Sequence, residues 1–581
     1  MTTTLSNERA VHVSPRATAA ATFLRPAWLF PFALLVQLIA VRLNCGPYDE
    51  FLSLYGAERV LRGGLPYRDF WTMYGPAQFY IIAAFFKLFG VNALAGRVYD
   101  ALIRAGIACA CFVLVAMLAP RRWALVAFGA VLVWLTCIHV PAYNFPAYAA
   151  LLGSLISAIF FARFLRNNDD TRMLFLSGLA VSVTATIRHD SGFYLCLAQL
   201  LMLAWVTVLK PSAIGVRIQA LRDFGRLAVR YFAGVVLIAG PLYLWLLLRV
   251  GFHPLFYDLI YVPAVIYPKV RRLPFLSAEA LSLLRHPLSW QGRLGLEAIV
   301  VVFPILAILS VFLCLLVTRR SNSRIFNATW RRQTFAMLLL LGILFFVKGL
   351  IRVSPIQMMQ SIVVAVILIT VLFGHRNRLG RLPRLSLYAC AFFLALCSYP
   401  LAFHLLPYAR HNLASLLHPQ AQGSLFHDCH RPADLARARC LELEPEVTAA
   451  VEDIERRTSP QDKIYVGSGH HDRLMLNDVR LYFLSGRSSI TPWYDLHPGV
   501  QTTLSIQNEI IDAMRRNPPK VIVLNTAWDN PVEPNQGSVS SGVTALDNYI
   551  HSHYTQQKTY GSIAILTPRA PQQAALITVR R

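Results

Sequence analysis

Two adjacent carboxylates, Asp49 and Glu50, are the residues of this sequence best suited to chemistry. They follow a hydrophobic run and open a long polar segment, Asn44-Cys45-Gly46-Pro47-Tyr48-Asp49-Glu50. Neighbouring like charges disfavour each other's ionised form, so such a pair needs a reason to be there. A positioned carboxylate can take a proton from the hydroxyl group of an acceptor. We therefore predict a catalytic site at Asp49 and Glu50, where a carboxylate takes a proton from an acceptor hydroxyl.

The composition is typical of a protein that crosses a membrane many times. The chain has 581 residues, of which 56% are hydrophobic and 15% are charged. A soluble protein of this size carries about 25% charged residues. The net charge of +25 fits cytoplasmic loops, which collect Lys and Arg in membrane proteins. No basic and aromatic binding module accompanies this charge, so we expect no nucleic-acid partner.

The hydrophobic pattern predicts a mainly α, polytopic helical membrane protein. About eleven apolar runs are long enough to cross roughly 30 Å of hydrocarbon. They cover residues 23–43, 95–118, 123–139, 144–165, 171–187, 191–209, 229–249, 294–318, 333–348, 353–373 and 385–403. A shorter run at 77–89 is expected to lie along the membrane interface.

The positions of Arg and Lys predict the orientation. With a cytoplasmic N-terminus, each cytoplasmic connection is basic, as the positive-inside rule requires. These connections hold Arg121-Arg122, Arg163 to Arg172, Lys210 to Arg230, Arg319 to Arg332 and Arg376 to Arg384. An odd number of spans then places the chain from about residue 404 on the outer face. Two outer loops, 44–94 and 250–293, are long, and long ordered loops are usually functional.

The first outer loop is expected to contain a short helix over residues 50–62. Glu58 and Arg62 are spaced to pair across one turn, and Gly63-Gly64 is expected to end the helix. Such a helix can lie in the headgroup plane and hold Asp49 at its N-terminal end, where the helix dipole stabilises a carboxylate. The alternative is that Asp49 only caps the helix.

The C-terminal part of the sequence has a different character. Short buried strands are predicted at 463–467, 520–524 and 562–566, with amphipathic helices at 446–457 and 505–516. Alternating strands and helices indicate a small α/β domain. The predicted organisation is a transmembrane domain (1–403), a linker (404–440) and a periplasmic α/β domain (441–581).

The first outer loop resembles the start of the GT-C membrane glycosyltransferases. The resemblance is greatest to the bacterial Rgt-type branch, which is related to protein O-mannosyltransferases and to aminoarabinose transferases. The matching motifs are Asp49-Glu50, Gly63-Gly64-Leu65-Pro66-Tyr67-Arg68-Asp69-Phe70, Gly75-Pro76, Tyr80, Phe89-Gly90 and Gly96-Arg97. The pattern covers about residues 44–100.

This resemblance implies a bacterial inner-membrane enzyme that uses a sugar carried on a polyprenyl phosphate. The sugar would pass to a lipid, glycan or protein acceptor on the outer face, by a single inverting displacement. Asp49 stands where the catalytic carboxylate of the family stands, and Glu50 is its usual neighbour. No acidic residue occurs in the next outer turn (139–144), so no cofactor is assigned and a divalent metal is left open.

The leaving phosphate requires positive charge, and three groups of outer residues are candidates for binding it. Arg can hold phosphate with two donors, whereas Lys acts as a point charge. The candidates are Lys269, Arg271 and Arg272 in the second outer loop, Lys348 and Arg352 around a tight outer turn, and Arg188. The alternatives are snorkelling to the interface or pairing with a nearby acid, as between Arg188 and Asp190.

Other functions are compatible with a membrane protein of this kind. A transporter or flippase of a lipid-linked or anionic solute is the main alternative, but transporters place polar residues at mid-membrane and often contain repeats. Here the ionisable residues lie at the ends of the spans. A non-catalytic scaffold leaves Asp49 and Glu50 unexplained. In the C-terminal region, the segment 493–498 contains Trp493, which we consider as a sugar-stacking residue, with core packing as the alternative.

Overall fold

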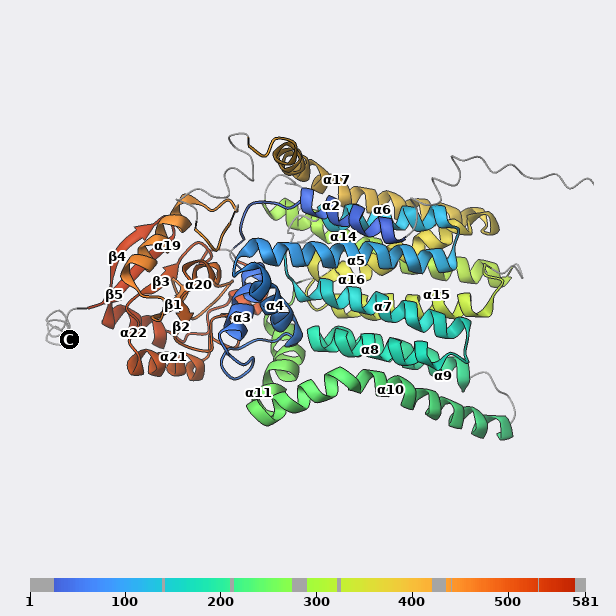
Figure 1. Cartoon of the computed structure of the whole chain (residues 1–581), viewed down its shortest axis with the longest axis horizontal. Coiled ribbons are helices and arrows are strands. Elements are labelled where there is room, and N and C mark those ends of the chain that lie inside the picture. Colours follow the sequence, from blue (N-terminus) through green and yellow to red (C-terminus); the bar gives the residue numbers. More distant parts are fainter. Residues whose placement is uncertain are drawn as a thin grey trace, which may run out of the picture.

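The structure, a computed structural model, describes residues 26–46, 48–137, 142–208, 214–273, 290–320, 325–420, 435–439, 441–530 and 532–569. In this part of the chain, a bundle of long helices lies at one end and a smaller domain with a sheet lies at the other (Figure 1). A layer of short helices separates them. The predicted division into a helical part and a C-terminal sheet domain is therefore visible in the fold.

Each of the predicted apolar runs falls on a helix. The helices are α2 (Pro26–Ile39), α5 (Ala93–Leu118), α6 (Arg121–Cys137), α7 (Pro146–Arg166), α8 (Thr171–Ile187), α9 (His189–Thr207), α10 (Ile214–Val250), α14 (Trp290–Arg320), α15 (Thr329–Gly349), α16 (Pro355–Gly374) and α17 (Arg381–Leu417). In the described residues, seven helices are long and apolar enough to cross a membrane, while α2 and α8 are shorter apolar helices. The chain is a multi-pass membrane protein, and among the residues that the structure describes, length and composition support seven of the about eleven predicted spans.

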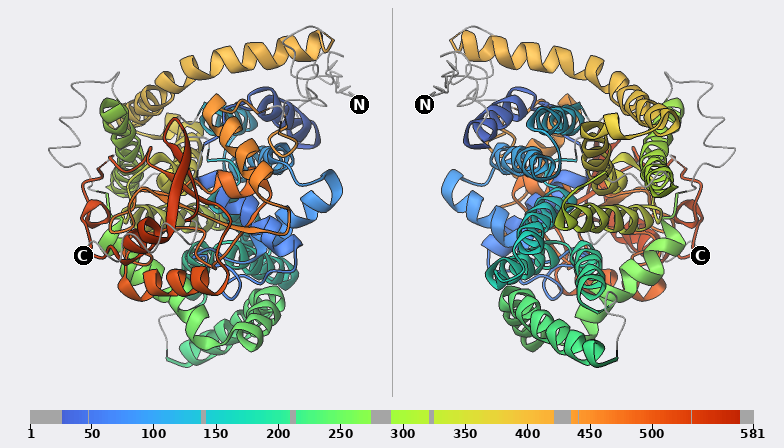
Figure 2. Two further views of the ribbon diagram at one scale, coloured as in Figure 1. Left: turned by 90° about the vertical axis from the view of Figure 1, so that its left-hand side faces the viewer. Right: turned by 90° about the vertical axis from the view of Figure 1, so that its right-hand side faces the viewer.

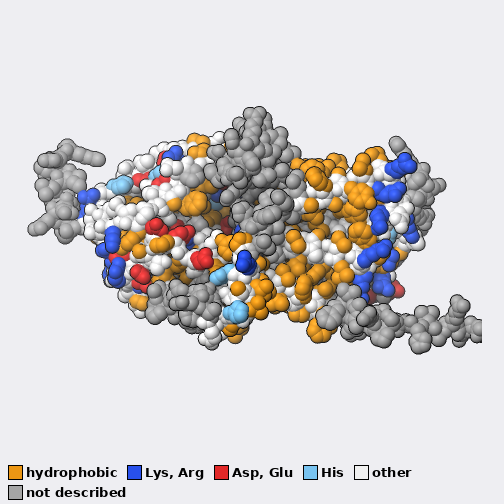
Figure 3. Space-filling model, turned by 90° about the horizontal axis from the view of Figure 1, so that it is seen from above, with side chains coloured by type: hydrophobic (Ala, Val, Ile, Leu, Met, Phe, Trp, Pro, Cys, Tyr) orange, Lys and Arg blue, Asp and Glu red, His pale blue; other side chains and the backbone are white. Residues whose placement is uncertain are grey.

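The bundle is apolar on its outside as well as in its core. Apolar side chains cover the flank of the helices, and Lys and Arg side chains gather at the end remote from the sheet (Figure 3). Helix α16 is largely buried and occupies the centre of the bundle. Helices α8 and α10 come close together because Gly178 and Gly234 leave room for the backbone of the partner helix.

Short helices between the bundle and the sheet come from the two long outer loops. They are α3 (Asp49–Leu61), α4 (Ala77–Phe89), α11 (Phe252–Phe256), the π-helix η1 (Tyr257–Ile266) and α12 (Tyr267–Val270). The prediction of a helix in the first loop is confirmed. Glu58 and Arg62 form the predicted ion pair at 2.5 Å, and the chain leaves α3 at Gly63, whose φ of 88° is unfavourable for other residues.

Helix α3 is buried, and the expectation that it lies in the headgroup plane is wrong. Phe51, Leu54 and Tyr55 have almost no exposed surface, because they share one hydrophobic core with the C-terminal domain. The Tyr55 ring stacks on that of Tyr482, with ring centroids 5.2 Å apart. The C-terminal domain covers the face of α3 that would otherwise contact lipid.

The C-terminal domain contains a five-stranded mixed sheet in the order β2-β1-β3-β5-β4. Strand β1 pairs in parallel with β2 and β3, whereas β5 is antiparallel to β3 and β4. The elements are α19 (Pro445–Arg457), β1 (Lys463–Ser468), α20 (Arg480–Ser485), β2 (Ser488–Ser489), α21 (Leu504–Arg516), β3 (Ile522–Asn525), α22 (Ala545–His553), β4 (Tyr554–Tyr560) and β5 (Ile563–Pro568), with a 3-10 turn at Gln536–Ser538. The three predicted strands and two predicted helices are confirmed.

Two views at right angles to the first show the sheet domain stacked on one end of the bundle (Figure 2). Helix α17 continues to Leu417, so helix extends into the first residues of the predicted linker 404–440. Much of the remaining linker lies outside the described residues. The parts of the molecule meet at the layer that carries α3, and the candidate site lies in that layer.

Candidate active site

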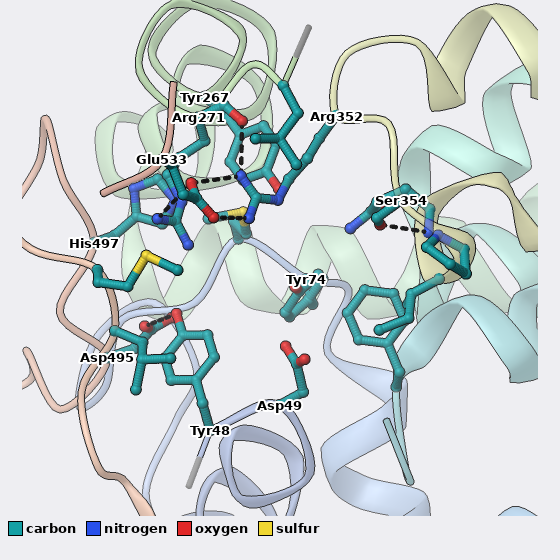
Figure 4. A pocket seen from close by; sticks show the side chains of 18 of the residues that line it. Tyr48, Asp49, Tyr74, Tyr267, Arg271, Arg352, Ser354, Asp495, His497 and Glu533 are labelled. Atoms are coloured by element: carbon teal, nitrogen blue, oxygen red, sulfur yellow. Dashed lines mark hydrogen bonds and ion pairs between the residues drawn. The ribbon is translucent and has the colours of Figure 1, made fainter. Parts of the chain in front are cut away.

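A cavity of about 300 Å³ lies where the bundle, the outer loops and the C-terminal domain meet (Figure 4). Each part contributes polar side chains to its wall. They are Tyr48, Asp49 and Tyr74 from the first outer loop, Tyr267 and Arg271 from the second, Arg352 and Ser354 from the turn between α15 and α16, and Asp495, His497 and Glu533 from the C-terminal domain. Residues far apart in the sequence therefore form one site.

Asp49 is the first residue of α3, and its carboxylate points into this cavity (Figure 4). The N-cap position is taken by Tyr48, and no side chain caps the helix, so the alternative that Asp49 serves as a cap is wrong. Within the described residues, no hydrogen-bond donor is paired with the Asp49 carboxylate. An unpaired carboxylate facing a cavity is available to accept a proton.

The surroundings of Asp49 act on its acidity in opposite directions. Burial raises the pKa of the Asp49 carboxyl above its ordinary value, and the positive charges of Arg352 and Arg271 oppose this shift only in part. A carboxylate with a raised pKa is a stronger base, and general-base catalysis works best when the pKa approaches the working pH. Burial thus makes Asp49 more basic, while Arg352 and Arg271 favour the ionised form that proton abstraction requires.

Glu50 lies outside this cavity, in contrast to the prediction that both carboxylates are catalytic. Its side chain is 5% exposed and accepts two hydrogen bonds of 2.8 Å from Arg97 of α5. Arg97 also donates to the backbone carbonyls of Arg42 and Asn44, which precede α3. This placement assigns Glu50 to anchoring the loop that carries Asp49, so adjacent residues in the sequence have separate tasks.

The predicted phosphate-binding group in the second outer loop contributes one residue to the cavity. Arg271 lines it and is nearly buried, whereas Lys269 and Arg272 are exposed outside it. Arg352 lines the same wall and donates to the backbone carbonyl of Arg271 at 2.9 Å. Two guanidinium groups from different loops therefore lie side by side above Asp49 (Figure 4).

A carboxylate of the C-terminal domain holds these two arginines. Glu533 accepts hydrogen bonds of 2.5 and 3.0 Å from Arg352 and lies 3.3 Å from Arg271. Burial raises the pKa of Glu533, but the hydrogen bond from Arg352 and the charge of Arg271 outweigh it and lower the pKa to about 2. The Nε–H of Arg271 is buried without a hydrogen-bond partner. One donor is thus left for a further acceptor.

The other predicted cations face an adjoining cavity of about 70 Å³. Arg188 forms the expected pair with Asp190 at 3.0 Å. Lys348 is buried, lies 3.3 Å from the same carboxylate, and donates to Ser191 and Gln360. Arg352 lines both cavities. Arg188 and Lys348 therefore line the adjoining cavity and not that of Asp49. Residues that line both cavities, such as Tyr74 and Arg352, lie between them and Asp49.

The sequence did not predict that a second acidic residue, Asp495, lies in the cavity of Asp49. Asp495 lines the cavity and accepts a 2.6 Å hydrogen bond from the hydroxyl of Tyr48. Burial raises the pKa of Asp495 to about 7, the charge of Asp49 adds to this, and the Tyr48 hydrogen bond and Arg271 oppose it. The aromatic residues of the segment 493–498 suggest sugar stacking, but nothing in the sequence connects this segment to Asp49.

A metal site has no complete ligand set in the part of the chain that the structure describes. No group of three or more His, Cys, Asp or Glu side chains there is arranged to hold a metal ion. Asp49 and Asp495 are the two carboxylates of the cavity that no arginine pairs.

Comparison with known proteins identifies the fold. No family model matches the sequence, and no curated protein matches it either. Among solved structures, ArnT from Cupriavidus metallidurans in the apo state is similar, with 14% identity over 96% of this chain and 99% of that chain and a TM-score of 0.52. The same protein bound to undecaprenyl phosphate is similar over the same shares, with 13% identity and a TM-score of 0.53.

The chain has the GT-C fold. An oligosaccharyltransferase from Archaeoglobus fulgidus, tethered to an acceptor peptide, is a more distant match, with 11% identity over 92% of this chain and 73% of that chain and a TM-score of 0.49. The two ArnT structures confirm the predicted resemblance to GT-C glycosyltransferases at the level of the fold. At these identities, the GT-C likeness extends over nearly the whole chain but says nothing of individual residues.

Proposed function

We propose that this protein is a membrane glycosyltransferase that moves a sugar from a polyprenyl-phosphate donor to an acceptor hydroxyl. One observation carries the proposal. On a GT-C fold, the unpaired carboxylate of Asp49 faces two adjacent arginines, Arg271 and Arg352, across a cavity of about 300 Å³. A base on one side and cations on the other are what a displacement at a sugar phosphate requires.

The donor phosphate is proposed to bind to Arg271 and Arg352. ArnT, which has this fold, has been solved with undecaprenyl phosphate bound. Arginine holds phosphate oxygens with paired donors, and Arg271 has a buried Nε–H without a partner. The remaining donors of the two arginines are partly taken by Glu533. A phosphate therefore competes with this carboxylate for the arginines.

The proposed reaction is a single displacement with inversion. Asp49 accepts the proton of the acceptor hydroxyl, and the oxygen attacks the anomeric carbon of the sugar. The bond between that carbon and the phosphate oxygen breaks, and the electron pair leaves with the polyprenyl phosphate. Arg271 and Arg352 stabilise the charge that develops on it. The acceptor is a lipid, a glycan or a protein that offers an alcohol.

The arrangement of charge favours this enzyme over a transporter. Transporters bind their substrates near the middle of the membrane, on interrupted helices. Here the cavity lies between the bundle and the sheet domain, and Asp49 belongs to a loop helix outside the bundle. Chemistry at the membrane surface accounts for this position.

The distribution of charged residues also supports an orientation of the chain in the membrane, which we propose as follows. Lys and Arg gather at the end of the bundle remote from the cavity (Figure 3), and cytoplasmic ends are basic. We therefore place the cavity and the domain at 441–581 outside the cytoplasm of a bacterial inner membrane, with about eleven spans before it. Protease added to spheroplasts is expected to cut within residues 441–581. Full protection of this domain, in spheroplasts whose cytoplasmic markers stay intact, contradicts the orientation.

Reconstitution in liposomes tests the function. Wild-type protein is given a series of labelled polyprenyl-phosphate sugars together with an envelope extract as acceptor source. Asp49→Asn is expected to lower kcat by about 10²–10⁴-fold, the usual contribution of a general base. Asp512→Asn is the control, because Asp512 is 61% exposed and pairs only with Arg515 on the surface. If Asp49→Asn transfers sugar as fast as wild type, Asp49 is not the base.

A further inference from the structure

A second cavity, of about 440 Å³, lies on the other side of the first outer loop and takes no part in the proposed reaction. Its walls come from that loop, from the start of η1 and from α21 of the C-terminal domain. The residues that matter here are Trp71, Tyr257, Asp258, Trp493 and Glu509. Its volume is within the range of roughly 300–1,000 Å³ that small-molecule sites occupy.

Aromatic rings form one side of this cavity. The rings of Trp71 and Trp493 pack with centroids 6.2 Å apart, and Tyr257 stacks on His253. Trp71 also packs against His497, with centroids 6.1 Å apart, and His497 lines the cavity of Asp49. The Trp71 ring is therefore the partition between the two cavities.

Polar groups without partners form the other side. Asp258 is 4% exposed, Tyr67 and Tyr257 lie within its electrostatic reach, and among the described side chains the indole N–H of Trp71 is the one donor directed at it. That N–H is itself buried without a well-aligned hydrogen bond. Glu509 stands exposed at the rim, and no ion pair ties it to another described residue. Buried polar groups normally have partners, so this wall lacks the acceptor or donor that a ligand supplies.

The acidity of Asp258 indicates which kind of ligand fits. Burial raises the pKa of the Asp258 carboxyl to about 8, and the contact with Trp71 opposes this shift. The group is then largely protonated at neutral pH and can both donate and accept a hydrogen bond. A hydroxyl group has the same double capacity, whereas a cation would require the ionised form.

We propose that this cavity binds a sugar ring, stacked on the partly exposed ring of Trp493, which Trp71 backs, and hydrogen-bonded to Asp258. One face of a pyranose consists of C–H groups and packs on an aromatic ring, while its rim consists of hydroxyls that need polar partners. The cavity offers both surfaces. Sugar binding stands on its own; that the sugar belongs to the acceptor rests on the proposed function.

This assignment extends the prediction that the segment 493–498 stacks a sugar. Trp493 lines the second cavity, while Asp495 and His497 line the first. Tyr494 between them is buried in the core against Tyr55, which is the packing role that we considered as the alternative. One segment of the C-terminal domain thus forms walls of both cavities.

Saturation-transfer NMR on the full chain in detergent tests sugar binding. The probes are free glucose, mannose and N-acetylglucosamine, with tetramethylammonium as the cationic probe. Wild type is expected to transfer saturation to at least one sugar. Asp258→Asn and Trp493→Ala are expected to weaken its Kd at least about tenfold, which corresponds to about 1.4 kcal/mol. Thermal unfolding shows whether each variant folds, and if Trp493→Ala does not, Asp258→Asn decides.

The controls separate this site from the reaction centre. Asp512→Asn and Asp49→Asn are expected to keep the sugar signal. Asp512 lies on α21 one turn after Glu509, the residue at the rim of the cavity. The proposal falls if no sugar shows saturation transfer, if only tetramethylammonium does, or if Asp49→Asn removes the signal and Asp258→Asn leaves it intact. Loss of transfer by Asp49→Asn with sugar binding kept supports both proposals. Sugar binding without any transferase activity in wild type leaves this site standing and overturns the function.

Discussion

At the scale of single residues, the cavity is controlled by two carboxyls that come from opposite ends of the chain. Asp49 and Asp495 both lose water on burial, which raises the pKa of each. They differ in their partners. The Tyr48 hydroxyl donates to Asp495, whereas Asp49 faces the arginines. When two acids share a site, the charge of one disfavours ionisation of the other, and their acid and base roles separate.

A pH series on Asp495→Asn tests this arrangement. The folded-state pKa of Asp495 is about 7, above the ordinary 3.8, so the folded protein holds a proton that the unfolded chain releases between these values. As pH rises from about 4 to about 7, wild type is expected to lose stability relative to Asp495→Asn by up to about 1.4 kcal/mol per pH unit. Thermal unfolding measures the difference.

The sign of that slope is diagnostic. A carboxylate held by a salt bridge gives the opposite result, because its protein gains stability as pH rises. A wild-type protein that gains stability relative to Asp495→Asn over this interval would show that Asp495 is ionised and paired. The pH dependence of kcat should also change in Asp495→Asn, because no neighbouring carboxylate then disfavours ionisation of Asp49.

Sequence reasoning found Asp49 but could not find Asp495. Asp49 belongs to a local motif at the end of an apolar run. The hydrogen bond from Tyr48 to Asp495 spans 447 positions of sequence, and no local pattern encodes it. The same limit explains Glu50. Its neighbour in the sequence is catalytic in our proposal, but its partner is Arg97 in the next long helix.

At the scale of elements, helix α3 positions Asp49, and the pair of Glu50 with Arg97 positions α3. Both side chains are buried, and they make two hydrogen bonds of 2.8 Å. A buried pair of this kind adds little net stability over apolar residues, but removal of one partner leaves an uncompensated charge. The pair therefore fixes the geometry of the loop.

Glu50→Gln is accordingly expected to destabilise the protein by about 3–5 kcal/mol, because Arg97 is left without its counter-charge. Thermal unfolding in detergent measures this effect. Glu452→Gln is the matched control, since Glu452 is exposed on α19. The double variant Glu50→Leu with Arg97→Met should recover much of the loss. A stable Glu50→Gln variant with full activity would contradict the anchoring role.

The elements that sequence predicted are those with a strong period or great length. Every apolar run became a helix, and the amphipathic helices α19 and α21 lie within one residue of their expected bounds. The missed elements are β2, α20, β4 and α22 in the C-terminal domain and α11, η1 and α12 in the second outer loop. Strand β2 has two residues and α20 has six, too few to establish a period. Strand β4 is largely exposed and polar, so it carries no apolar signal.

At the scale of the whole molecule, the C-terminal domain forms part of the wall of the proposed active site. The sequence presents it as a separate α/β domain behind a linker. In the structure it shares a hydrophobic core with α3, and Glu533 ties it to Arg271 and Arg352 of the two outer segments. Pairing across three segments of the chain leaves no trace in local sequence, so this union could not be predicted.

Glu533 therefore stabilises the fold but competes with the donor phosphate for the arginines, and its removal should separate these two effects. The pKa of Glu533 is lowered from 4.5 to about 2, so its ion pairs stabilise the fold above about pH 4.5, and this contribution disappears as pH falls toward 2. At pH 7, Glu533→Gln is expected to lower the Tm by several degrees, with Glu452→Gln as the unaffected control. The difference from wild type should shrink on acidification.

The same substitution should strengthen donor binding. Glu533 occupies donors of Arg271 and Arg352 that we assign to the phosphate, so the phosphate must displace it. With a neutral Gln, the arginines keep their full positive charge for the ligand, and the KM for the polyprenyl-phosphate sugar is expected to fall while the Tm falls. If Glu533 instead holds the two arginines in the geometry that binds phosphate, its removal is expected both to lower the Tm and to weaken donor binding. A KM that rises in Glu533→Gln would therefore show that Glu533 shapes the arginines for the phosphate and does not compete with it.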